Sequence, residues 1–526
     1  MKILMDMGTS STRLWLVKGD AILAQKKGAF GASLSQREGK EGLFAALSAL
    51  LDALLLEANA TAESVSFIAV SGMAGSEIGL YDLPHTTLPT GLYELSARAE
   101  RVVLPEVSSI PFLFVPGVKV MAGEGLADLM RGEETEVAGI LSRFPEAKDS
   151  LIVLPGTHNK YVRVDGEGQI IDFHTAMSGE LIAVIMGNTI LRDALSFDFT
   201  LDEAALLRGA AYVAREGLGA ALFSIRVAAK NGKSKDDLTS FLFGAVLSED
   251  AAQIRRRACG ARVFVGGRAS LRRALVLLLE GERVYELDES ISSGAVREGL
   301  LRICSIRARM ERRGAVLRTV EREKLIAIVR NPDDETLLPA VEALYAGGVR
   351  LIELTFDRTG TVSAEKTAER IRRLSEAFAD RMLVGAGTVT RDRELCLARD
   401  AGAAFIISPN LDAALIRKTR AEGLVSMPAA MTPTEIAAAV DAGADYVKLF
   451  PANALADGYF GAVTAPLSDA KLLAVGGVTA ENTAELLARG FCGVGVGGNL
   501  YDKKLIAQGD YAGLTALAKQ FTEATK

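Results

Sequence analysis

The sequence predicts an α/β protein with more than one domain, and three observations support this. A chain of 526 residues is longer than one hydrophobic core can organise. Two strand–turn–strand units of the same plan recur before residue 305. Short apolar strands alternate with alanine- and leucine-rich helical segments from residue 323 onward. We therefore expect one domain over residues 1–305, a linker over 306–322 and a second domain over 323–526.

Composition narrows the classes of function. The net charge of -6 argues against general nucleic-acid binding, which needs a basic surface. The four cysteines lack the paired spacing of a zinc site, and three histidines are too few for a histidine-rich metal site. Asp6 interrupts the apolar start, so we expect no signal peptide, and no apolar run is long enough to span a bilayer. We expect a cytoplasmic protein with small-molecule partners, no nucleic acid and no membrane, whose only metal accompanies a nucleotide.

The chain opens with an apolar strand over Ile3 to Met5, a polar turn from Asp6 to Arg13 and a second strand over Leu14 to Val17. Glycine in such a turn lets backbone N–H groups approach an anion, hydroxyls add donors, and an aspartate can hold Mg²⁺ through water. An ordinary polar β-turn has the same pattern, so both interpretations stay open. The expected nucleotide contacts are Gly8, Thr9 and Ser10, with Asp6 at the metal.

A glycine-rich stretch over residues 116–135 carries Asp128, Arg131 and Glu133 at helix-like spacing. A run of charges usually marks a solvated helix face. The functional alternative is a carboxylate base together with an arginine that binds an acidic sugar.

The plan of the N-terminus recurs at residues 151–164, where an apolar strand, a turn with Gly156, Thr157 and His158, and another strand follow one another. Two such units far apart in sequence are typical of actin-like kinases of the ribonuclease H-like type, whose two lobes clamp ATP phosphates between hairpins. A later strand over Val263 to Val265 leads into a double glycine and a helix, a turn that could lie against adenosine. That double glycine is Gly266 and Gly267.

Together these segments resemble the 2-dehydro-3-deoxygalactonokinase family. The resemblance rests on Asp6–Ser10 with Arg13–Leu16, Asp128–Thr135, Pro155–Lys160 and Phe173–Glu180. It implies phosphorylation of the terminal hydroxyl of a six-carbon 2-keto-3-deoxy sugar acid, with ATP and Mg²⁺ as cofactors. Met7 and Ala176 depart from the family pattern without removing a chemical group.

Phosphoryl transfer needs a carboxylate oriented toward the attacking hydroxyl. We assign that role to Asp128, the metal to Asp6 and substrate binding to Arg131. The two aspartates could exchange duties, or Glu133 could serve as the base, and sequence distance does not rank them.

Arginines crowd the segment from Arg302 to Lys324, with few large apolar residues after Met310. The pattern predicts a terminal helix followed by a short solvated connector. It does not resemble a nucleic-acid patch, because interleaved aromatics are missing and the chain is acidic.

Eight apolar strands with helices between them predict a (β/α)₈ TIM barrel for the last domain. Catalytic groups of such barrels sit at the C-terminal ends of the strands. The expected strands are Leu325–Val329, Leu351–Thr355, Met382–Gly385, Ala404–Ser408, Leu424–Met427, Tyr446–Phe450, Leu472–Val475 and Gly493–Val496.

Lys448 is a lone lysine within an apolar strand, and desolvation there should lower its pKa and make the amine a nucleophile for a carbonyl. A lysine that snorkels to solvent is the alternative. Glu353 on the second strand, at the same barrel mouth, favours the functional interpretation. Glycine pairs after the last two strands predict a phosphate site made of Gly476, Gly477, Gly497, Gly498 and Asn499.

The segments Ile352–Thr355, Gly385–Val389, Ser408–Asn410, Val447–Ala452 and Ala474–Val478 resemble the 2-keto-3-deoxy-6-phosphogluconate, phosphogalactonate and 4-hydroxy-2-oxoglutarate aldolases. The resemblance implies a class I aldolase in which Lys448 forms a Schiff base and Glu353 moves protons, without a cofactor. It also implies a homo-oligomer, a trimer through the barrel. The substrate contacts it implies are Arg330, Arg358, Thr388, Ser408, Pro409 and Phe450.

Two departures affect substrate orientation. Asp357 stands where several relatives have an arginine, so the carboxylate contact falls to Arg358 or Arg330. Pro428-Ala429-Ala430 replaces an expected proline–glycine.

The two domains fit as consecutive steps, because the first makes the 6-phosphate ester that the second cleaves. We expect a bifunctional enzyme of D-galactonate catabolism. One alternative keeps both reactions on the gluconate-derived epimer. Another makes the N-terminal half a sensor or assembly module without turnover.

Overall fold

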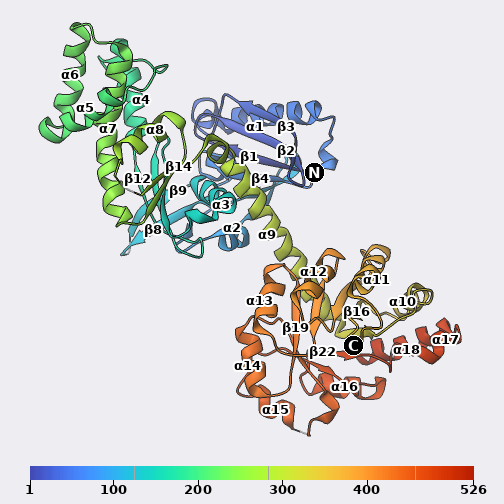
Figure 1. Cartoon of the computed structure of the whole chain (residues 1–526). Coiled ribbons are helices and arrows are strands. Elements are labelled where there is room, and N and C mark those ends of the chain that lie inside the picture. Colours follow the sequence, from blue (N-terminus) through green and yellow to red (C-terminus); the bar gives the residue numbers. More distant parts are fainter. Residues whose placement is uncertain (124, 282, 457) are drawn as a thin grey trace. The chain divides into compact units, whose positions relative to one another are not determined.

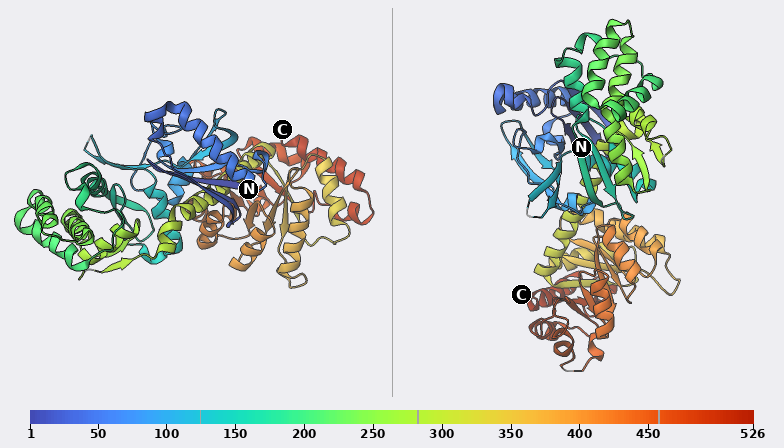
Figure 2. Two further views of the ribbon diagram at one scale, coloured as in Figure 1. Left: turned by 90° about the horizontal axis from the view of Figure 1, so that it is seen from above. Right: turned by 90° about the vertical axis from the view of Figure 1, so that its left-hand side faces the viewer.

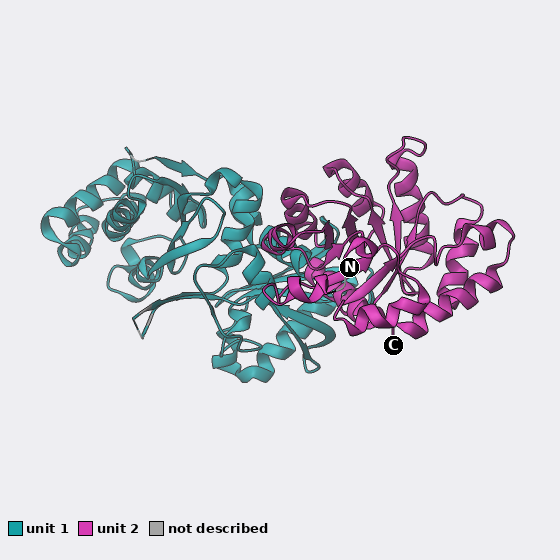
Figure 3. Ribbon diagram, turned by 90° about the horizontal axis from the view of Figure 1, so that it is seen from below, with its two compact units in different colours: residues 1–307 teal, residues 308–526 magenta. Residues whose placement is uncertain are grey.

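The computed structural model describes residues 1–123, 125–281, 283–456 and 458–526, and it divides into two compact units. Unit 1 comprises Met1–Arg307 and unit 2 comprises Ala308–Lys526 (Figure 3). No helix in the described part of the chain is long and apolar enough to cross a membrane.

Unit 1 contains two sheets of the same plan, as the repeated strand–turn–strand units predict. In each, a central strand pairs antiparallel with a hairpin partner on one side and parallel with a later strand on the other. The first sheet has the order β3-β2-β1-β4-β7-β6 and the second β12-β11-β10-β13-β14. The strands of the first sheet are β1 (Lys2–Met7), β2 (Thr12–Lys18), β3 (Ala21–Gly28), β4 (Ile68–Gly72), β6 (Glu100–Leu104) and β7 (Ser108–Phe114). Those of the second are β10 (Ser150–Leu154), β11 (Asn159–Val164), β12 (Ile170–Ala176), β13 (Arg262–Val265) and β14 (Val284–Glu286).

Successive side chains of the central strands point to opposite faces of each sheet and pack into separate apolar cores in unit 1. Ile3 and Met5 of β1 pack in the cluster that contains α1, whereas Leu4 joins a cluster on the opposite face. Ile152 of β10 belongs to that same second cluster, so both sheets contribute to one shared core. The helices that begin in unit 1 are α1 (Leu34–Glu57), α2 (Leu92–Arg98), α3 (Glu133–Arg143), α4 (Ser178–Asn188), α5 (Glu203–Glu216), α6 (Leu218–Lys230), α7 (Lys235–Ala258), α8 (Ala269–Leu278) and α9 (Glu289–Glu323), of which α9 continues into unit 2.

Helices α4 to α7 form a cluster at one end of unit 1, next to the five-stranded sheet (Figures 1 and 2). They are inserted between β12 and β13, and α7 packs against β10. The insertion therefore lies beside the second hairpin turn.

The helix-like spacing around Asp128 is misleading, because Asp128 lies on a strand. Strands β8 (Val118–Ala122) and β9 (Gly125–Met130) pair antiparallel, and with β5 (Thr86–Thr87) they form a third sheet. Gly132 adopts a φ of 113°, where the chain turns from β9 into α3. The charges at Asp128 and Glu133 therefore belong to different elements.

The expected solvated connector at 306–322 is helical, since α9 continues to Glu323. Val316 and Val320 are four residues apart on this helix and both are buried against the apolar interior of unit 2. Arg313 pairs with Asp445. Because arginines dominate this segment, sequence reasoning missed that Val316 and Val320 have the spacing of one apolar helix face.

Unit 2 is a closed parallel barrel of eight strands, as predicted, with helices around it (Figure 1). The strands are β15 (Leu325–Val329), β16 (Leu351–Thr355), β17 (Leu383–Gly387), β18 (Phe405–Ser408), β19 (Val425–Ala430), β20 (Val447–Leu449), β21 (Leu472–Val475) and β22 (Gly493–Val496). The helices after α9 are α10 (Leu337–Ala346), α11 (Ala364–Ala377), α12 (Asp392–Asp400), α13 (Ala413–Ala421), α14 (Pro433–Asp441), α15 (Tyr459–Thr464), α16 (Ala480–Ala488), α17 (Lys503–Ala507) and α18 (Tyr511–Ala524).

Leu351 and Tyr446 pack inside the barrel, in one cluster with residues of β15, β18, β19 and β21. Successive side chains of a strand alternate between faces. Glu353 and Lys448, each two residues further along, therefore point into the barrel above this apolar layer.

Candidate active sites

Glu353 and Lys448 form the centre of the barrel mouth. Both are buried, with 1% and 9% of their surface exposed. Burial lowers the pKa of Lys448 and nearby Arg330 lowers it too, whereas Glu353 acts in the opposite direction. Burial raises the pKa of Glu353, which the charges of Lys448 and Arg330 partly offset. Lys448 is therefore a desolvated amine beside a desolvated carboxyl group.

A glycine makes room for this carboxyl group. A methyl group on Gly387 would lie 1.5 Å from Glu353 Oε1, so a larger residue at the end of β17 would displace the carboxyl group. Glu353 Oε2 and Thr355 Oγ1 are buried and have no hydrogen-bond partner among the described residues. Thr388 follows with a φ of 58°, a strained value for a β-branched residue. The unpartnered oxygens leave polar capacity for a ligand.

The Phe450 ring lies beside the lysine, with its centre 4.8 Å from Lys448 Nζ. Its surface is 39% exposed, so the ring forms part of the opening. Ser408 is buried at the end of β18, and Pro409 is exposed directly after it.

A cavity of about 680 Å³ adjoins this centre and is lined by the ends of β21 and β22. Gly476 and Gly477 have φ values of 102° and 70°, which only glycine adopts easily. The space beside Gly497 and Gly498 is open. Arg330, Phe450, Asn499, Lys503 and Lys504 also line the cavity.

Arg358 is held at the side of the mouth by Glu394. Its Nη1 donates to Glu394 Oε1 at 2.9 Å, and the other oxygen of Glu394 accepts the backbone N–H of Thr390 at 2.7 Å. Glu394 thus ties the loop after β16 to the loop after β17.

In unit 1, Asp6 lies next to the last residue of β1 and accepts from Arg13 Nε at 3.0 Å and Nη2 at 2.5 Å. The carbonyls of Gly8 and Thr9 accept backbone N–H groups of Ala32 and Ser33. These bonds hold the first turn in place.

The second turn is tied in the same way. The Gly156 N–H donates to Asn159 Oδ1 at 3.0 Å, and the backbone N–H of Glu180 donates to the carbonyl of Thr157 at 2.8 Å. His158 Nε2 lies 2.8 Å from Glu180 Oε2.

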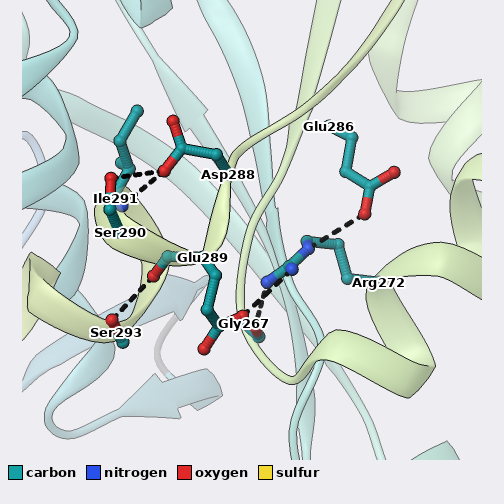
Figure 4. A network of polar contacts seen from close by, with 8 residues as sticks. All are labelled: Gly267, Arg272, Glu286, Asp288, Glu289, Ser290, Ile291 and Ser293. Carbon is teal, nitrogen blue, oxygen red and sulfur yellow. Dashed lines mark hydrogen bonds and ion pairs between the residues drawn. The ribbon is translucent and has the colours of Figure 1, made fainter.

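The double glycine lies beside the second turn. Gly266 donates its N–H to the carbonyl of Val153, and Gly267, with a φ of 69°, packs on Pro155. Arg272 donates to the carbonyl of Gly267 and pairs with Glu286 and Glu289 (Figure 4). This network fixes the backbone at the start of α8.

Asp128 is fixed from β12. Its Oδ2 accepts the N–H of Thr175 and its Oδ1 accepts the Thr175 hydroxyl, both at 2.7 Å. His174 Nδ1 lies 3.9 Å away, and burial lowers the pKa of this histidine. Lys160 Nζ also donates to the Thr175 hydroxyl, at 2.8 Å.

Arg131 is buried and donates to the carbonyl of Leu83 at 2.6 Å, while its Nη2 lies 3.1 Å from His85 Nδ1. Burial and the charge of Arg131 lower the pKa of His85 to about 4. The guanidinium therefore joins the 83–85 segment to the start of α3.

Three acidic residues crowd the start of α3. Burial raises the pKa of Glu133, against the charges of Lys160 and His158. Burial and the charge of Glu133 raise the pKa of Glu134 to about 7 and that of Glu136 to about 8, and Asp6 adds to the effect on Glu136. The charges of Lys160 and His158, on the second hairpin, therefore act on Glu133. Glu133 also lies in the same acidic group as Asp6.

Two family models match the chain. Residues 6–303 match 2-keto-3-deoxy-galactonokinase, and residues 316–517 match KDPG and KHG aldolase. The first match covers more than half of the chain. This protein belongs to the 2-keto-3-deoxy-galactonokinase family and carries an aldolase domain. The kinase domain implies use of ATP, and the class I aldolase domain implies a Schiff-base lysine.

Three relatives illustrate the likeness. The 2-dehydro-3-deoxy-6-phosphogalactonate aldolase of Escherichia coli is 31% identical over 38% of this chain and 96% of its own length. A 2-dehydro-3-deoxy-phosphogluconate aldolase of Treponema pallidum is 32% identical over 39% of this chain and 95% of its own length. A Rhizobium meliloti protein named "Probable 2-dehydro-3-deoxygalactonokinase DgoK1" is 33% identical over 36% of this chain and 58% of its own length.

The structure brings the expected aldolase residues to one mouth, with Arg358 tied to Glu394 at its side. In the kinase domain, Arg131 contacts Leu83 and His85 through Nη2, whereas its buried Nη1 has no hydrogen-bond partner among the described residues. Sequence reasoning missed Lys503 and Lys504, although a basic pair shortly after the last glycine pair could have indicated them. It also missed Glu394 of α12 and the role of Gly387, because both depend on contacts between segments that are far apart in the sequence.

Proposed function

We propose that this chain catalyses two consecutive reactions of D-galactonate catabolism. The kinase domain, residues 1–305, phosphorylates 2-dehydro-3-deoxy-D-galactonate at its terminal hydroxyl. The aldolase domain, residues 323–526, cleaves the resulting 6-phosphate to pyruvate and D-glyceraldehyde 3-phosphate. The observation that carries the proposal is the buried Glu353 and Lys448 pair beside a glycine-lined cavity, in one chain with a kinase domain that can supply the phosphate ester.

In the cleavage step, Lys448 Nζ attacks the C2 carbonyl, and loss of water gives an iminium. Glu353 takes the proton of the C4 hydroxyl, the C3–C4 bond breaks, and its electron pair moves into the iminium to give an enamine. The aldehyde leaves. Protonation at C3 and hydrolysis then release pyruvate and restore the amine.

The substrate's two charged ends would bind to different groups around Lys448. The glycines of the 680 Å³ cavity, with Asn499, would take the phosphate through backbone N–H groups. Arg330 or Arg358 would take the carboxylate, and Thr388, Ser408, Pro409 and Phe450 would enclose the carbon chain.

Asp6 and the residues around it suit Mg²⁺. The buried hydroxyl of Ser71, which pairs in register with Asp6, has no partner among the described residues. Oxygen donors of this type are those that Mg²⁺ prefers. When bound, the metal and ATP supply charge neutralisation and the phosphoryl group. Gly8, Thr9, Ser10, Gly156, Thr157 and His158 would hold the phosphates, and Gly266 and Gly267 the adenosine.

The attacking hydroxyl needs a base, and Asp128 is our first assignment. Its carboxylate is oriented by two bonds from Thr175, as positioning requires. Glu133 is the second candidate, since burial raises its pKa and so makes its carboxylate a stronger base.

Coupled assays test the proposal. Pyruvate release is followed with ATP, Mg²⁺ and either 2-keto-3-deoxygalactonate or 2-keto-3-deoxygluconate, and separately with each 6-phosphate. We expect faster turnover of the galactonate series in both steps. Preference for the gluconate series would transfer the assignment to that epimer. Absence of pyruvate from all four compounds would refute the proposed function.

We also propose a cytoplasmic homo-oligomer, a trimer through the barrel. Cytoplasmic ATP supports the location, and the likeness to small aldolase barrels supports the assembly. Light scattering on the whole chain would test the trimer, because it measures the mass of the assembly in solution.

A further inference from the structure

Asp250 is a buried carboxylate in α7 at which three elements of the kinase domain meet. Its Oδ1 accepts from Asn159 Nδ2 at 2.6 Å and from the Tyr161 hydroxyl at 2.5 Å. Its Oδ2 accepts from the Ser178 hydroxyl at 2.5 Å. Strand β11, the start of α4 and the middle of α7 are thus joined through one side chain.

Asp250 is an acidic side chain in an otherwise apolar, buried part of α7. Asp250 is 2% exposed, and Leu247, Ala251 and Ile254 beside it on α7 are buried and apolar. A buried carboxylate loses its hydration, and the three hydrogen bonds that it accepts offset that cost. These bonds also fix the geometry of its partners.

Asn159, the first partner of Asp250, connects it to the second hairpin turn. A carboxylate only accepts hydrogen bonds, so Asp250 fixes the Asn159 side chain with Nδ2 toward it. Oδ1 of Asn159 then faces the other way and accepts the N–H of Gly156 at 3.0 Å. Without Asp250 the amide could turn over and present a donor to that N–H, which would break the bond.

The third partner holds the other side of the same turn. Ser178 begins α4, and the next residue, Gly179, packs so closely that a methyl group there would lie 1.8 Å from the carbonyl oxygen of Gly156. The N–H of Glu180 bonds the carbonyl of Thr157 at 2.8 Å. Asp250 therefore acts on both sides of the turn through Asn159 and Ser178.

We propose that Asp250 is a positioning residue for the phosphates of ATP, which it sets through Asn159 and Ser178 without touching the nucleotide. The proposal rests on the proposed function, in which the Gly156–Thr157 turn binds those phosphates. It assigns to the α4–α7 insertion the task of fixing the turn.

The kinetic test uses Asp250→Ala in the full chain. We expect kcat/KM for ATP to fall at least tenfold, while KM for the sugar acid changes less than twofold. Aldolase activity on the 6-phosphate, measured on the same sample, should be unchanged. Asp250→Asn, whose Oδ1 can still accept from Asn159, should recover most of the loss.

The matched control is Tyr161→Phe, which removes a hydroxyl from the same carboxylate oxygen but leaves the path to Gly156 intact. It should change kcat/KM for ATP less than twofold. In a double-mutant cycle, Asn159→Ala added to Asp250→Ala should cause little further loss, because the two act in series. Equal losses in Asp250→Ala and Tyr161→Phe, or additive losses in the cycle, would overturn the proposal.

Hydrogen exchange separates this inference from the proposed function. In the free chain, the peptide that contains the Gly156 N–H should exchange faster in Asp250→Ala than in wild type and Tyr161→Phe. Unchanged exchange would refute the positioning role even if the kinase is active. Wild type without ATP-dependent turnover would refute the kinase assignment whatever the exchange shows. If Asp250→Ala does not fold, kcat/KM for ATP and hydrogen exchange of the Gly156 peptide are measured on Asn159→Ala instead.

Discussion

Glu353 and Lys448 each shift the pKa of the other toward its charged form, while burial shifts both toward neutrality. Burial is the larger effect on each group. The amine is thus less basic than an exposed lysine and the carboxyl group is a weaker acid than an exposed glutamate. This balance favours a neutral nucleophile next to a proton carrier.

Lys448→Ala should abolish borohydride trapping of pyruvate and lower aldol cleavage by more than about 100-fold. Mass spectrometry of the trapped chain identifies the modified residue. The matched control is Lys471→Ala, whose half-exposed ammonium pairs with Glu321 at 2.8 Å. Equal labelling of Lys448→Ala and wild type would disprove the assignment.

Gly387→Ala should disable the aldolase and spare the kinase. The added methyl group would fall 1.5 Å from Glu353 Oε1, so the carboxyl group must move. A displacement of about 1 Å at a reacting group can cost about 100-fold in rate. Gly461→Ala is the control, because open space surrounds that glycine. Full aldolase activity in Gly387→Ala would show that Glu353 can act from another position.

Asp128→Asn and Glu133→Gln separate the two candidate bases of the kinase. Loss of a general base lowers kcat by about 100-fold or more. We expect this for Asp128→Asn and a smaller effect for Glu133→Gln, measured by ADP release with saturating sugar acid. The reverse order would make Glu133 the base.

Glu136 should make the kinase domain less stable as pH rises. Its pKa is raised from 4.5 to about 8 in the folded chain, so the folded state keeps a proton that the unfolded state has released. Its contribution is therefore complete below about pH 4.5 and is lost as pH rises through about 8. Glu136→Gln should flatten the decline in urea-unfolding free energy between pH 5 and 8. An unchanged slope would assign the decline to other groups, such as Glu134.

The sequence alone predicted the repeated hairpin units and the eight barrel strands. These depend on local alternation of apolar and polar residues, which survives without tertiary information. Four of the eight barrel strands have the expected ends, and the other four differ by up to three residues at an end, as β19 shows by extending to Ala430. Charge spacing favoured a helix face for the segment around Asp128, because that spacing does not reveal the pairing partner that makes the segment a strand.

For the sites, sequence determined which residue types end the strands: Lys448, Glu353 and the glycine pairs. Only the tertiary structure decided what each of them meets. The space that Gly387 leaves for Glu353, the bond from Arg358 to Glu394 and the convergence on Asp250 join residues far apart in sequence. Burial and hydrogen bonding set these relationships, and both exist only once the elements have packed.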